Sequence, residues 1–309
     1  MGIYDSSRTR VAPVFGRLQC LDPSGRLWLQ GLLELANTRK VPRPQAGTSR
    51  LLVAKWWPRE ARLAAPPGLL QWLLEHAEEP HNPKAWGRRP EVVANRRRIV
   101  DRDADTLAAA LKSLQARRAS PRAWYVLEGP SQPDVYLASD DAVIVVEGKR
   151  TETAPATSTD WMRVRHQMLR HLDGAWEHRQ GRQIYGLFIV EAEQGTSSAE
   201  ASSAWQEAVE LTVSQHVLNG SLPHRSPEER SQIAGALLGV TTWQALCDEF
   251  QLPREVLIPE VLDDRQPPGA TRRKSRKSLG PASQLDELDP AEALRTGDQL
   301  GTPLEHLSE

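Results

Sequence analysis

The sequence has only two cysteines among its 309 residues, and Cys20 and Cys247 stand far apart. Two distant cysteines form neither a disulfide framework nor a metal motif. This usage is typical of a reducing compartment, so we expect a cytoplasmic protein. No run approaches eighteen apolar residues, and the first residues lack the basic-then-apolar pattern of a secretion signal. We therefore expect neither a membrane span nor export.

An excess of charge of either sign is also missing, because the formal net charge is −1. This value excludes a chain that binds nucleic acid through overall basicity, so any attraction to phosphates has to come from local patches. The segment 84–98 is one such patch, with a single acid, Glu91. Its basic residues are Lys84, Arg88, Arg89, Arg96, Arg97 and Arg98. Lysine itself is scarce, with seven lysines against 32 arginines, which makes Lys149 at the end of an apolar run notable.

The middle of the chain carries short apolar runs that predict strands. Residues 123–127, 134–138 and 142–149 are rich in β-branched and aromatic side chains and are linked by turns too short for parallel crossovers. They should form an antiparallel meander. Helical spacing then predicts a helix over 160–179, and a nearly continuous apolar run predicts a central strand over 183–190.

The flanking regions divide the chain into three parts. Residues 1–99 contain short apolar runs among Pro and Gly, which indicate a β-containing N-terminal addition, followed by a helix near 69–74. Residues 100–262 begin with a helix over 103–117, contain the predicted strands and end in helices. The C-terminal helices are expected over 198–217, 227–238 and 241–250. Beyond that point apolar periodicity stops, so 263–309 is expected to be a disordered tail with one basic cluster.

The most informative pattern lies at the ends of two predicted strands. Asp134 follows Pro133 at the start of one strand, and the next strand ends in Glu147-Gly148-Lys149. Because side chains alternate along a strand, Glu147 and Lys149 share a face with the apolar Val145. Burying charged side chains on such a face costs free energy unless they are paired, which indicates a functional cluster. The alternative is a strand whose end frays into solvent.

Pro133-Asp134, Glu147-Gly148-Lys149 and the order of elements resemble the PD-(D/E)xK, or restriction-endonuclease-like, nuclease superfamily over about residues 100–217. The resemblance implies an α/β core, α-β-β-β-α-β, with a mixed four-stranded central sheet flanked by helices. It also implies phosphodiester hydrolysis with Mg²⁺ or Mn²⁺, held by Asp134, Glu147 and the carbonyl of Gly148. Lys149 would orient or deprotonate the attacking water, or stabilise the pentavalent phosphate. An extended run from Glu147 to His171 is similar to uncharacterised bacterial members.

The predicted helix after the third strand adds a polar face. In related branches a Gln followed four residues later by an aromatic side chain faces the metal, and Gln167 and His171 have this spacing. Gln167 is therefore a candidate catalytic residue. Arg163, Arg170 and His171 on this face, together with Arg150, are candidates for binding nucleic acid. A solvated helix face with ordinary surface charges is the alternative.

One element of the family pattern is missing. Many members carry a Glu on the first core helix, whereas residues 103–117 contain none. Glu128, Asp103 or Glu91 could supply this acid. The gap keeps two functions open, because inactive relatives share the fold.

The first function is a metal-dependent deoxyribonuclease of defence, repair or mobile-element biology. The second is a catalytically inactive module of the same fold that binds nucleic acid or protein. DNA is the expected partner, with RNA not excluded. A homodimer would fit a duplex substrate, because cutting both strands often takes two sites. Any motor would have to be a separate chain, because the sequence has no phosphate-binding loop of its own.

Overall fold

The structure is a computed structural model that describes residues 6–42, 50–116, 123–193 and 199–258. Residues Met1–Pro259 form one compact unit. The tail expected over 263–309 lies outside the described residues. Within the described ranges, the longest apolar helices fall short of what a membrane crossing requires.

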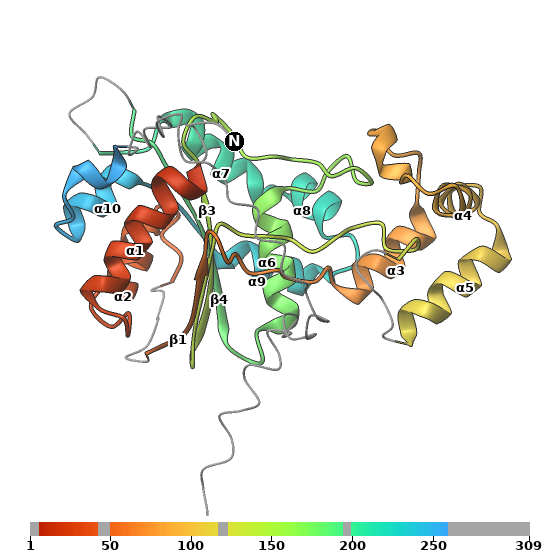
Figure 1. Cartoon of the computed structure of the whole chain (residues 1–309), viewed down its shortest axis with the longest axis horizontal. Helices are drawn as coiled ribbons and strands as arrows, with labels where there is room; N and C mark the ends of the chain where they lie inside the picture. Colours follow the sequence, from red (N-terminus) through yellow and green to blue (C-terminus); the bar gives the residue numbers. More distant parts are fainter. Residues whose placement is uncertain (1–5, 43–49, 117–122, 194–198, 259–309) are drawn as a thin grey trace, which may run out of the picture. The chain divides into compact units, whose positions relative to one another are not determined.

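A five-stranded mixed sheet organises the described part of the chain, which is therefore an α/β protein (Figure 1). Its strands are β1 (Leu51–Trp56), β2 (Val135–Ser139), β3 (Ala142–Gly148), β4 (Gln183–Val190) and β5 (Leu237–Thr242). They lie side by side in chain order. The first three are antiparallel, and β4 and β5 continue parallel to β3.

Helices cover both faces of this sheet (Figure 1). One face packs against α1 (Ala12–Leu21), α2 (Leu29–Ala36) and α10 (Trp243–Glu249). The other packs against α6 (Gln167–His178), α7 (Ser203–Thr212), α8 (Gln215–Ser221) and α9 (Pro227–Ala236). Alternation along β3 produces the two layers, because Ile144 and Val146 join the first core while Val143 and Val145 join the second. Two short helical turns, η1 (Ser7–Val11) and η3 (Arg254–Leu257), contact each other and α1.

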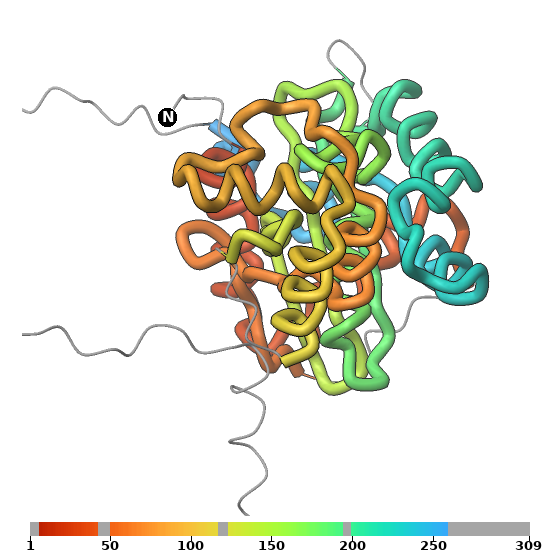
Figure 2. The backbone as a smooth tube through the Cα atoms, turned by 90° about the vertical axis from the view of Figure 1, so that its right-hand side faces the viewer, coloured from red at the N-terminus to blue at the C-terminus, as the bar shows by residue number. Residues whose placement is uncertain are grey.

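A separate helical module stands between β1 and β2. It consists of α3 (Pro67–His76), the turn η2 (Pro83–Trp86), α4 (Pro90–Val100) and α5 (Ala104–Gln115). Leu70, Leu73, Ile99 and Ala110 belong to a hydrophobic cluster distinct from the two sheet cores. Figure 2 shows these helices, orange to yellow, facing the viewer. The module is therefore an insertion with its own core.

The prediction for the N-terminal region is wrong about the secondary structure before residue 37, and it leaves one strand out of the central sheet. The expected short strands and turns give way to helical residues over Ser7–Leu21 and 29–36, because Val14, Phe15 and Leu18 recur at helical spacing and are buried. Leu51–Trp56 is indeed a strand, but it belongs to the central sheet, which has five strands instead of four.

The predicted strand over 123–127 does not form. Trp124 and Tyr125 lie in a turn, and Tyr125, Val126 and Leu127 are buried in the core of the helical module. An apolar run of five residues fits either a strand or a loop that packs onto a core, and packing against α3 and α5 decides it here.

The remaining elements agree with the prediction except at boundaries. The strands expected over 134–138, 142–149 and 183–190 are β2, β3 and β4, and α3 and α5 match two expected helices. The helix expected over 160–179 begins only at Gln167, and the one expected over 198–217 divides into α7 and α8. The helix expected to end at Leu238 ends at Ala236, where β5 begins.

We expect Gly239→Ala to lower the free energy of unfolding by about 2 kcal/mol or more, because two penalties add. Gly239 in β5 has φ +138°, and an added Cβ would lie 2.0 Å from Thr38 Oγ1 and 3.0 Å from the carbonyl oxygen of Ala36. Urea unfolding followed by circular dichroism measures the change.

The matched control is Gly235→Ala in α9, where an added Cβ meets nothing within 4 Å. It should leave stability unchanged or raise it by about 0.5–1 kcal/mol, as expected for Gly→Ala in a helix. Equal midpoints for the two variants would contradict the strain assigned to Gly239.

Candidate metal-dependent site

The register of β2 and β3 brings the two predicted acids together. Val135 is opposite Val146, so the next pair outward is Asp134 opposite Glu147. Opposed residues in an antiparallel ladder point to the same face. Tyr136 and Val145 mark this face as the one covered by α6. Glu147 and Lys149 alternate onto the same face, as the sequence predicts.

The carboxylate of Glu147 is held by three side-chain donors although it is only 5% exposed. Gln167 Nε2 donates to Oε1 at 2.6 Å, and the ammonium of Lys149 lies 2.9 Å from the same oxygen. His171 Nε2 lies 3.0 Å from Oε2. An ionised carboxylate only accepts, so the imidazole carries its proton on Nε2. The acid is therefore fixed in orientation by β3 and by α6.

These contacts determine the protonation states of Glu147 and Lys149. Burial alone would raise the pKa of Glu147, but the hydrogen bond and charge of His171, and then the charge of Lys149, outweigh it and lower that pKa. Burial alone would likewise lower the pKa of Lys149, but Glu147 outweighs it and raises that pKa. Both groups are thus ionised at neutral pH, as a carboxylate and an ammonium.

Asp134 is in a different state. Its Oδ1 accepts from the hydroxyl of Ser7 at 2.7 Å, and its Oδ2 accepts from the backbone N–H of Gly148 at 2.9 Å. Burial and then the negative charge of Glu147 raise the pKa of Asp134 to about 7. Asp134 is therefore partly protonated at neutral pH, whereas Glu147 is ionised.

Gly148 lies between the two acids in the chain and in space. A Cβ there would lie 2.8 Å from Trp243 Cζ2 and 2.9 Å from Val11 Cγ2, so only glycine fits without a shift. Trp243 Nε1 also donates to the carbonyl of Lys149 at 2.9 Å. Helices α10 and η1 thereby fix the backbone that carries Glu147 and Lys149.

The loop after β3 closes over Lys149. Glu152 Oε1 lies 3.9 Å from its ammonium, while Oε2 accepts from the backbone N–H groups of Arg150 and Thr151 at 3.2 Å. Arg150 in turn donates to Thr9 Oγ1 at 3.3 Å. Arg150 is half-buried at the site, where the sequence places it as a candidate for binding nucleic acid.

The oxygen donors at this site fit a hard divalent cation in chemistry. Asp134 and Glu147 supply carboxylate oxygens, the ligands that Mg²⁺ and Mn²⁺ prefer. Gln167 Oε1 is buried without a hydrogen-bond partner among the described residues, so one further oxygen is unsatisfied beside Glu147. No group of three or more His, Cys, Asp or Glu side chains suited to a metal occurs in the described ranges. The protein therefore offers two carboxylates as acidic ligands, and neutral oxygens of the protein or of water would have to complete the coordination.

The arginines expected on the helix face lie elsewhere. Because α6 begins at Gln167, Arg163 is exposed in the preceding loop and does not share the helix face. Arg170 donates to the carbonyls of Gly129 and Pro130 at 2.9 and 3.1 Å, and its Nε lies 3.4 Å from Glu128. Its guanidinium supports the loop before Asp134. His171 is buried against Glu147, which makes it a partner of the acid instead of a phosphate contact.

The three candidates for the missing acid do not join the two carboxylates. Glu128 is buried, but Arg165 binds it through Nε and Nη2 at distances down to 2.8 Å. Asp103 caps α5 by accepting from the N–H of Thr106. Glu91 is exposed in the first turn of α4. Each has local contacts of its own, and no hydrogen bond or ion pair joins any of them to Asp134 or Glu147 in the described part of the chain.

Glu128 belongs to a buried ionic cluster under the site. Arg165, whose side chain is fully buried, bridges Glu128 and Asp173. Arg225, which lies just before α9, also binds Asp173, at 2.9 Å. Burial would raise the pKa of Asp173, but Arg165 and its neighbours outweigh it and lower that pKa to about 2. These paired charges join the loop before α6 to the helices around it.

Ser7 and Thr9 were not predicted as site residues. They come from η1, which is far from Asp134 in the sequence. Ser7 and Asp134 are 127 residues apart. The segment Ser6-Ser7-Arg8-Thr9 has no hydrophobic period, so no local signal places it at the sheet. Only the apolar spacing of Val11, Val14 and Phe15 behind it indicates a packed helix.

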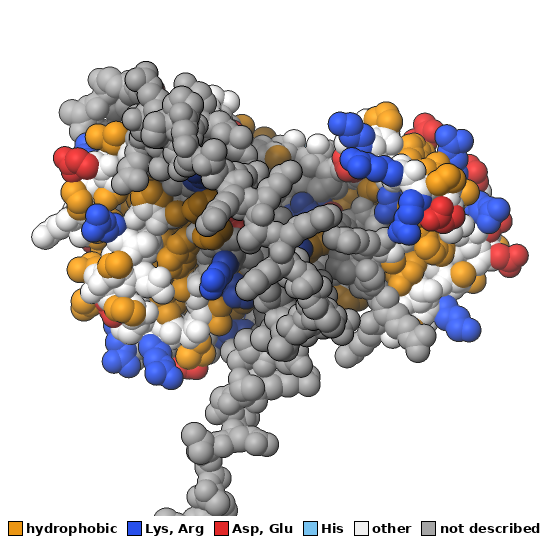
Figure 3. Space-filling view, viewed as in Figure 1, with side chains coloured by type: hydrophobic (Ala, Val, Ile, Leu, Met, Phe, Trp, Pro, Cys, Tyr) orange, Lys and Arg blue, Asp and Glu red, His pale blue; other side chains and the backbone are white. Residues whose placement is uncertain are grey.

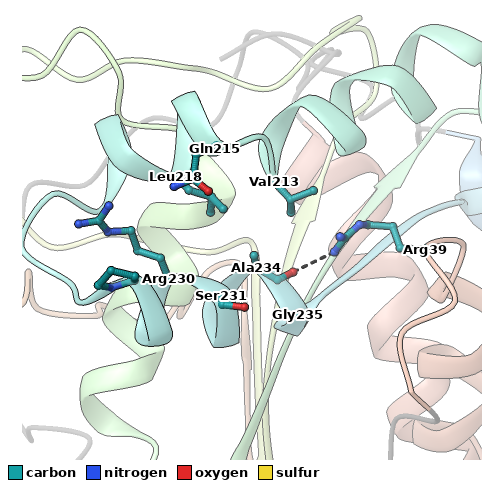
Figure 4. Close-up of a pocket in the computed structure, with 9 residues that line it drawn as sticks. Arg39, Val213, Gln215, Leu218, Arg230, Ser231, Ala234 and Gly235 are labelled. Atoms are coloured by element: carbon teal, nitrogen blue, oxygen red, sulfur yellow. Dashed lines mark hydrogen bonds between the residues drawn. The ribbon is translucent and has the colours of Figure 1, made fainter.

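A second hollow lies apart from these residues, among α7, α8 and α9 (Figure 4). Its volume is about 380 Å³, and Arg39, Gln215, Arg230 and Ser231 are among its polar lining residues. Arg39 donates to the carbonyl oxygens of Ala234 and Leu237. None of the predicted site residues lines it.

Comparison with protein-family models, with curated proteins and with solved structures finds no match to this chain.

The raised pKa of Asp134 predicts a pH-dependent loss of stability in metal-free buffer. In the unfolded chain this carboxyl ionises near pH 3.8, whereas in the folded protein it holds its proton up to about pH 7. The folded state therefore binds the extra proton between these values, and its stability falls as the pH rises from about 4 to about 7. The loss amounts to at most about 4 kcal/mol.

Asp134→Asn removes this loss, so the variant should be more stable than the parent at pH 8, with the difference vanishing below about pH 4. Urea unfolding in EDTA across this range measures it. Asp140→Asn, at an exposed aspartate in the turn of the same hairpin, is the control and should follow the parent. Parallel pH profiles for Asp134→Asn and the parent would contradict the burial assigned to Asp134.

Proposed function

We propose that this chain is a divalent-metal-dependent nuclease that hydrolyses phosphodiester bonds of DNA. The carrying observation is that Asp134, next to the Val135–Val146 pair, accepts from the N–H of Gly148 while Lys149 contacts Glu147 at 2.9 Å. Two carboxylates and one ammonium at a sheet edge are the groups needed to hold a cation next to an anionic phosphate.

The arrangement of elements supports the proposal. Helix α2, strands β1, β2 and β3, helix α6 and strand β4 follow one another in the order expected of the restriction-endonuclease-like core. The pairing is antiparallel between the first three strands and parallel between β3 and β4. In this view β5 and the helical module are additions, and the N-terminal helices supply the first core helix in place of residues 103–117.

The cation-binding residues in this proposal are Asp134 and Glu147, with the carbonyl of Gly148 as a third oxygen. Mg²⁺ or Mn²⁺ bound there would activate water at neutral pH and neutralise charge on the phosphate. Ser7 and the N–H of Gly148 orient Asp134, and Gln167 and His171 orient Glu147. Oriented carboxylates of this kind hold their geometry when the substrate arrives.

Lys149 acts as a cation in this proposal. Because Glu147 raises its pKa, its ammonium keeps the proton at neutral pH and is not suited to remove one from water. A fixed ammonium stabilises the negative charge that develops on the phosphoryl oxygens. Of the three roles that the sequence leaves open for Lys149, this argues against removal of a proton from water and leaves orienting the water or stabilising the phosphate.

A catalytically inactive module that binds nucleic acid or protein is the second candidate. One observation favours it, namely that no third acidic ligand joins Asp134 and Glu147 among the described residues. DNA is the proposed partner in both cases, and RNA, a homodimer or a separate motor chain stay open. The free thiols, Cys20 exposed and Cys247 buried, suit the proposed cytoplasmic setting.

The nuclease proposal predicts that the purified protein cleaves plasmid or linear DNA with Mg²⁺ or Mn²⁺ and stops in EDTA. Lys149→Ala and Glu147→Gln should each lower the cleavage rate by about 100-fold or more, since each removes a charge that acts on the reacting phosphate. Gel electrophoresis over a time course measures the rate.

Lys112→Ala is the matched control, because Lys112 is an exposed lysine on α5 and alanine suits a helix. It should cleave like the parent. Equal trace cleavage by the parent, Lys149→Ala and Glu147→Gln would identify a contaminant and support the inactive module.

Metal binding gives a prediction that does not depend on turnover. At pH 6–7 Asp134 is partly protonated in the metal-free protein, so a bound cation should expel that proton. Calorimetric titration with Mn²⁺ in two buffers of different ionisation enthalpy should show release of up to about one proton. The release should disappear in Asp134→Asn, and a titration with no heat above dilution would favour the inactive module.

A further inference from the structure

A group of exposed cations gathers on the helical module, around η2 and α4. We call it the basic surface, and its residues are Lys84, Arg88, Arg89, Arg97 and Arg98. Figure 3 shows several Lys and Arg side chains on this part of the molecule, with Asp and Glu side chains among them. The formal net charge of the whole chain is −1, so this local excess is set against a near-neutral background. It is not part of the carboxylate site.

The local structure does not account for all of these charges. Arg88 and Arg89 directly precede α4, where the helix dipole disfavours cations. Arg96, by contrast, has a structural role, because it is not exposed and donates to the carbonyls of Trp124, Ala85 and Val126. The neighbouring acid Glu91 lies 3.6 Å from Arg89 Nε, with both side chains more than 60% exposed, which contributes little stability.

The spacing of the cations fits two strands of phosphates. Arg89 immediately precedes α4 and Arg97 lies in its last turn, and the two are eight residues apart, which is about 12 Å along a helix. The major groove of B-form DNA is also about 12 Å wide. Between them the exposed face carries Ala94, whose small side chain allows close approach. Arg97 is held in place by the ring of Trp86, 5.8 Å from its guanidinium carbon.

The module is anchored where the carboxylates lie. The chain leaves the sheet at Trp56 and returns at Asp134, next to Val135, the residue that pairs with Trp56. On its other side the module contacts the loop that leads into Gln167. His81 N donates to the carbonyl of Asp160, and Asn82 Nδ2 donates to the Asp160 carboxylate at 2.9 Å. The module is thus joined to the sheet at the β1–β2 pair next to Asp134, and it is hydrogen-bonded to the loop before α6.

We propose that the basic surface binds the phosphate backbone of duplex DNA, with Arg88 and Arg89 on one strand and Arg97 and Arg98 on the other. The helical module inserted between β1 and β2 is then the DNA-binding arm of the chain. The choice of DNA as ligand rests on the proposed nuclease function, and the binding itself is independent of cleavage.

The test is fluorescence anisotropy of a short labelled duplex in EDTA, which prevents cleavage, at several salt concentrations. The variant Arg88→Ala/Arg89→Ala/Arg97→Ala/Arg98→Ala should bind at least about tenfold more weakly at 0.1 M salt and lower the slope of log K against log[salt] by about 3. Arg17→Ala/Arg26→Ala, which removes two exposed arginines in or next to α1, should bind like the parent. Circular dichroism and thermal unfolding verify that both variants are folded.

Because EDTA prevents turnover, binding is measured separately from cleavage, and Lys112→Ala, at an exposed lysine on α5 outside the basic surface, should bind the duplex like the parent. Unchanged affinity and salt slope in the fourfold variant would overturn the proposal, as would tighter binding of duplex RNA or single-stranded DNA than of duplex DNA. A parent protein that binds but never cleaves would overturn the nuclease function and leave the arm in place. A parent protein that cleaves while the fourfold variant binds normally would overturn only the arm.

Discussion

The buried carboxylate of Glu147 is the constraint on which the arrangement of β3 and α6 depends. Moving an ionised carboxyl out of water is costly unless hydrogen bonds and an opposite charge replace the lost solvation. Gln167 and His171 from α6, and Lys149 directly after β3, provide that replacement. The N-terminal part of α6, from Gln167 to His171, must therefore lie close to the strand. Gly186 in β4 permits this approach, since a Cβ there would lie 2.9 Å from Met168 Sδ.

Much of the sheet can be predicted from sequence because β2, β3 and β4 are nearly continuous apolar runs bounded by turns. β5 escapes prediction because Leu237 and Leu238 continue the apolar spacing of α9, and the change to extended backbone at Leu237 depends on pairing with β4. The apolar run over 123–127 causes the opposite error, because it predicts a strand that does not form. Its side chains are buried in the core of the helical module instead, and no local sequence pattern indicates this packing.

The candidate site divides in the same way. Asp134, Glu147 and Lys149 can be placed together from sequence because one hairpin joins them and strand alternation fixes their common face. Gln167 and His171 follow from helical spacing. Ser7 cannot be placed, because its contact with Asp134 depends on how the N-terminal helices pack against the sheet. The burial of Glu128 with Arg165 is equally long-range and turns a candidate ligand into part of the scaffold.

The position of the helical module has a consequence for folding. Strands β1 and β2 are neighbours in the sheet, yet the whole module separates them in sequence, so pairing them means closing a long loop. Such closure costs entropy that grows with loop length. A module with its own hydrophobic core can form first and hold its two ends near each other, which shortens the effective loop. An insertion with its own core therefore adds less to the entropy cost of pairing β1 with β2 than an unstructured loop of the same length would add.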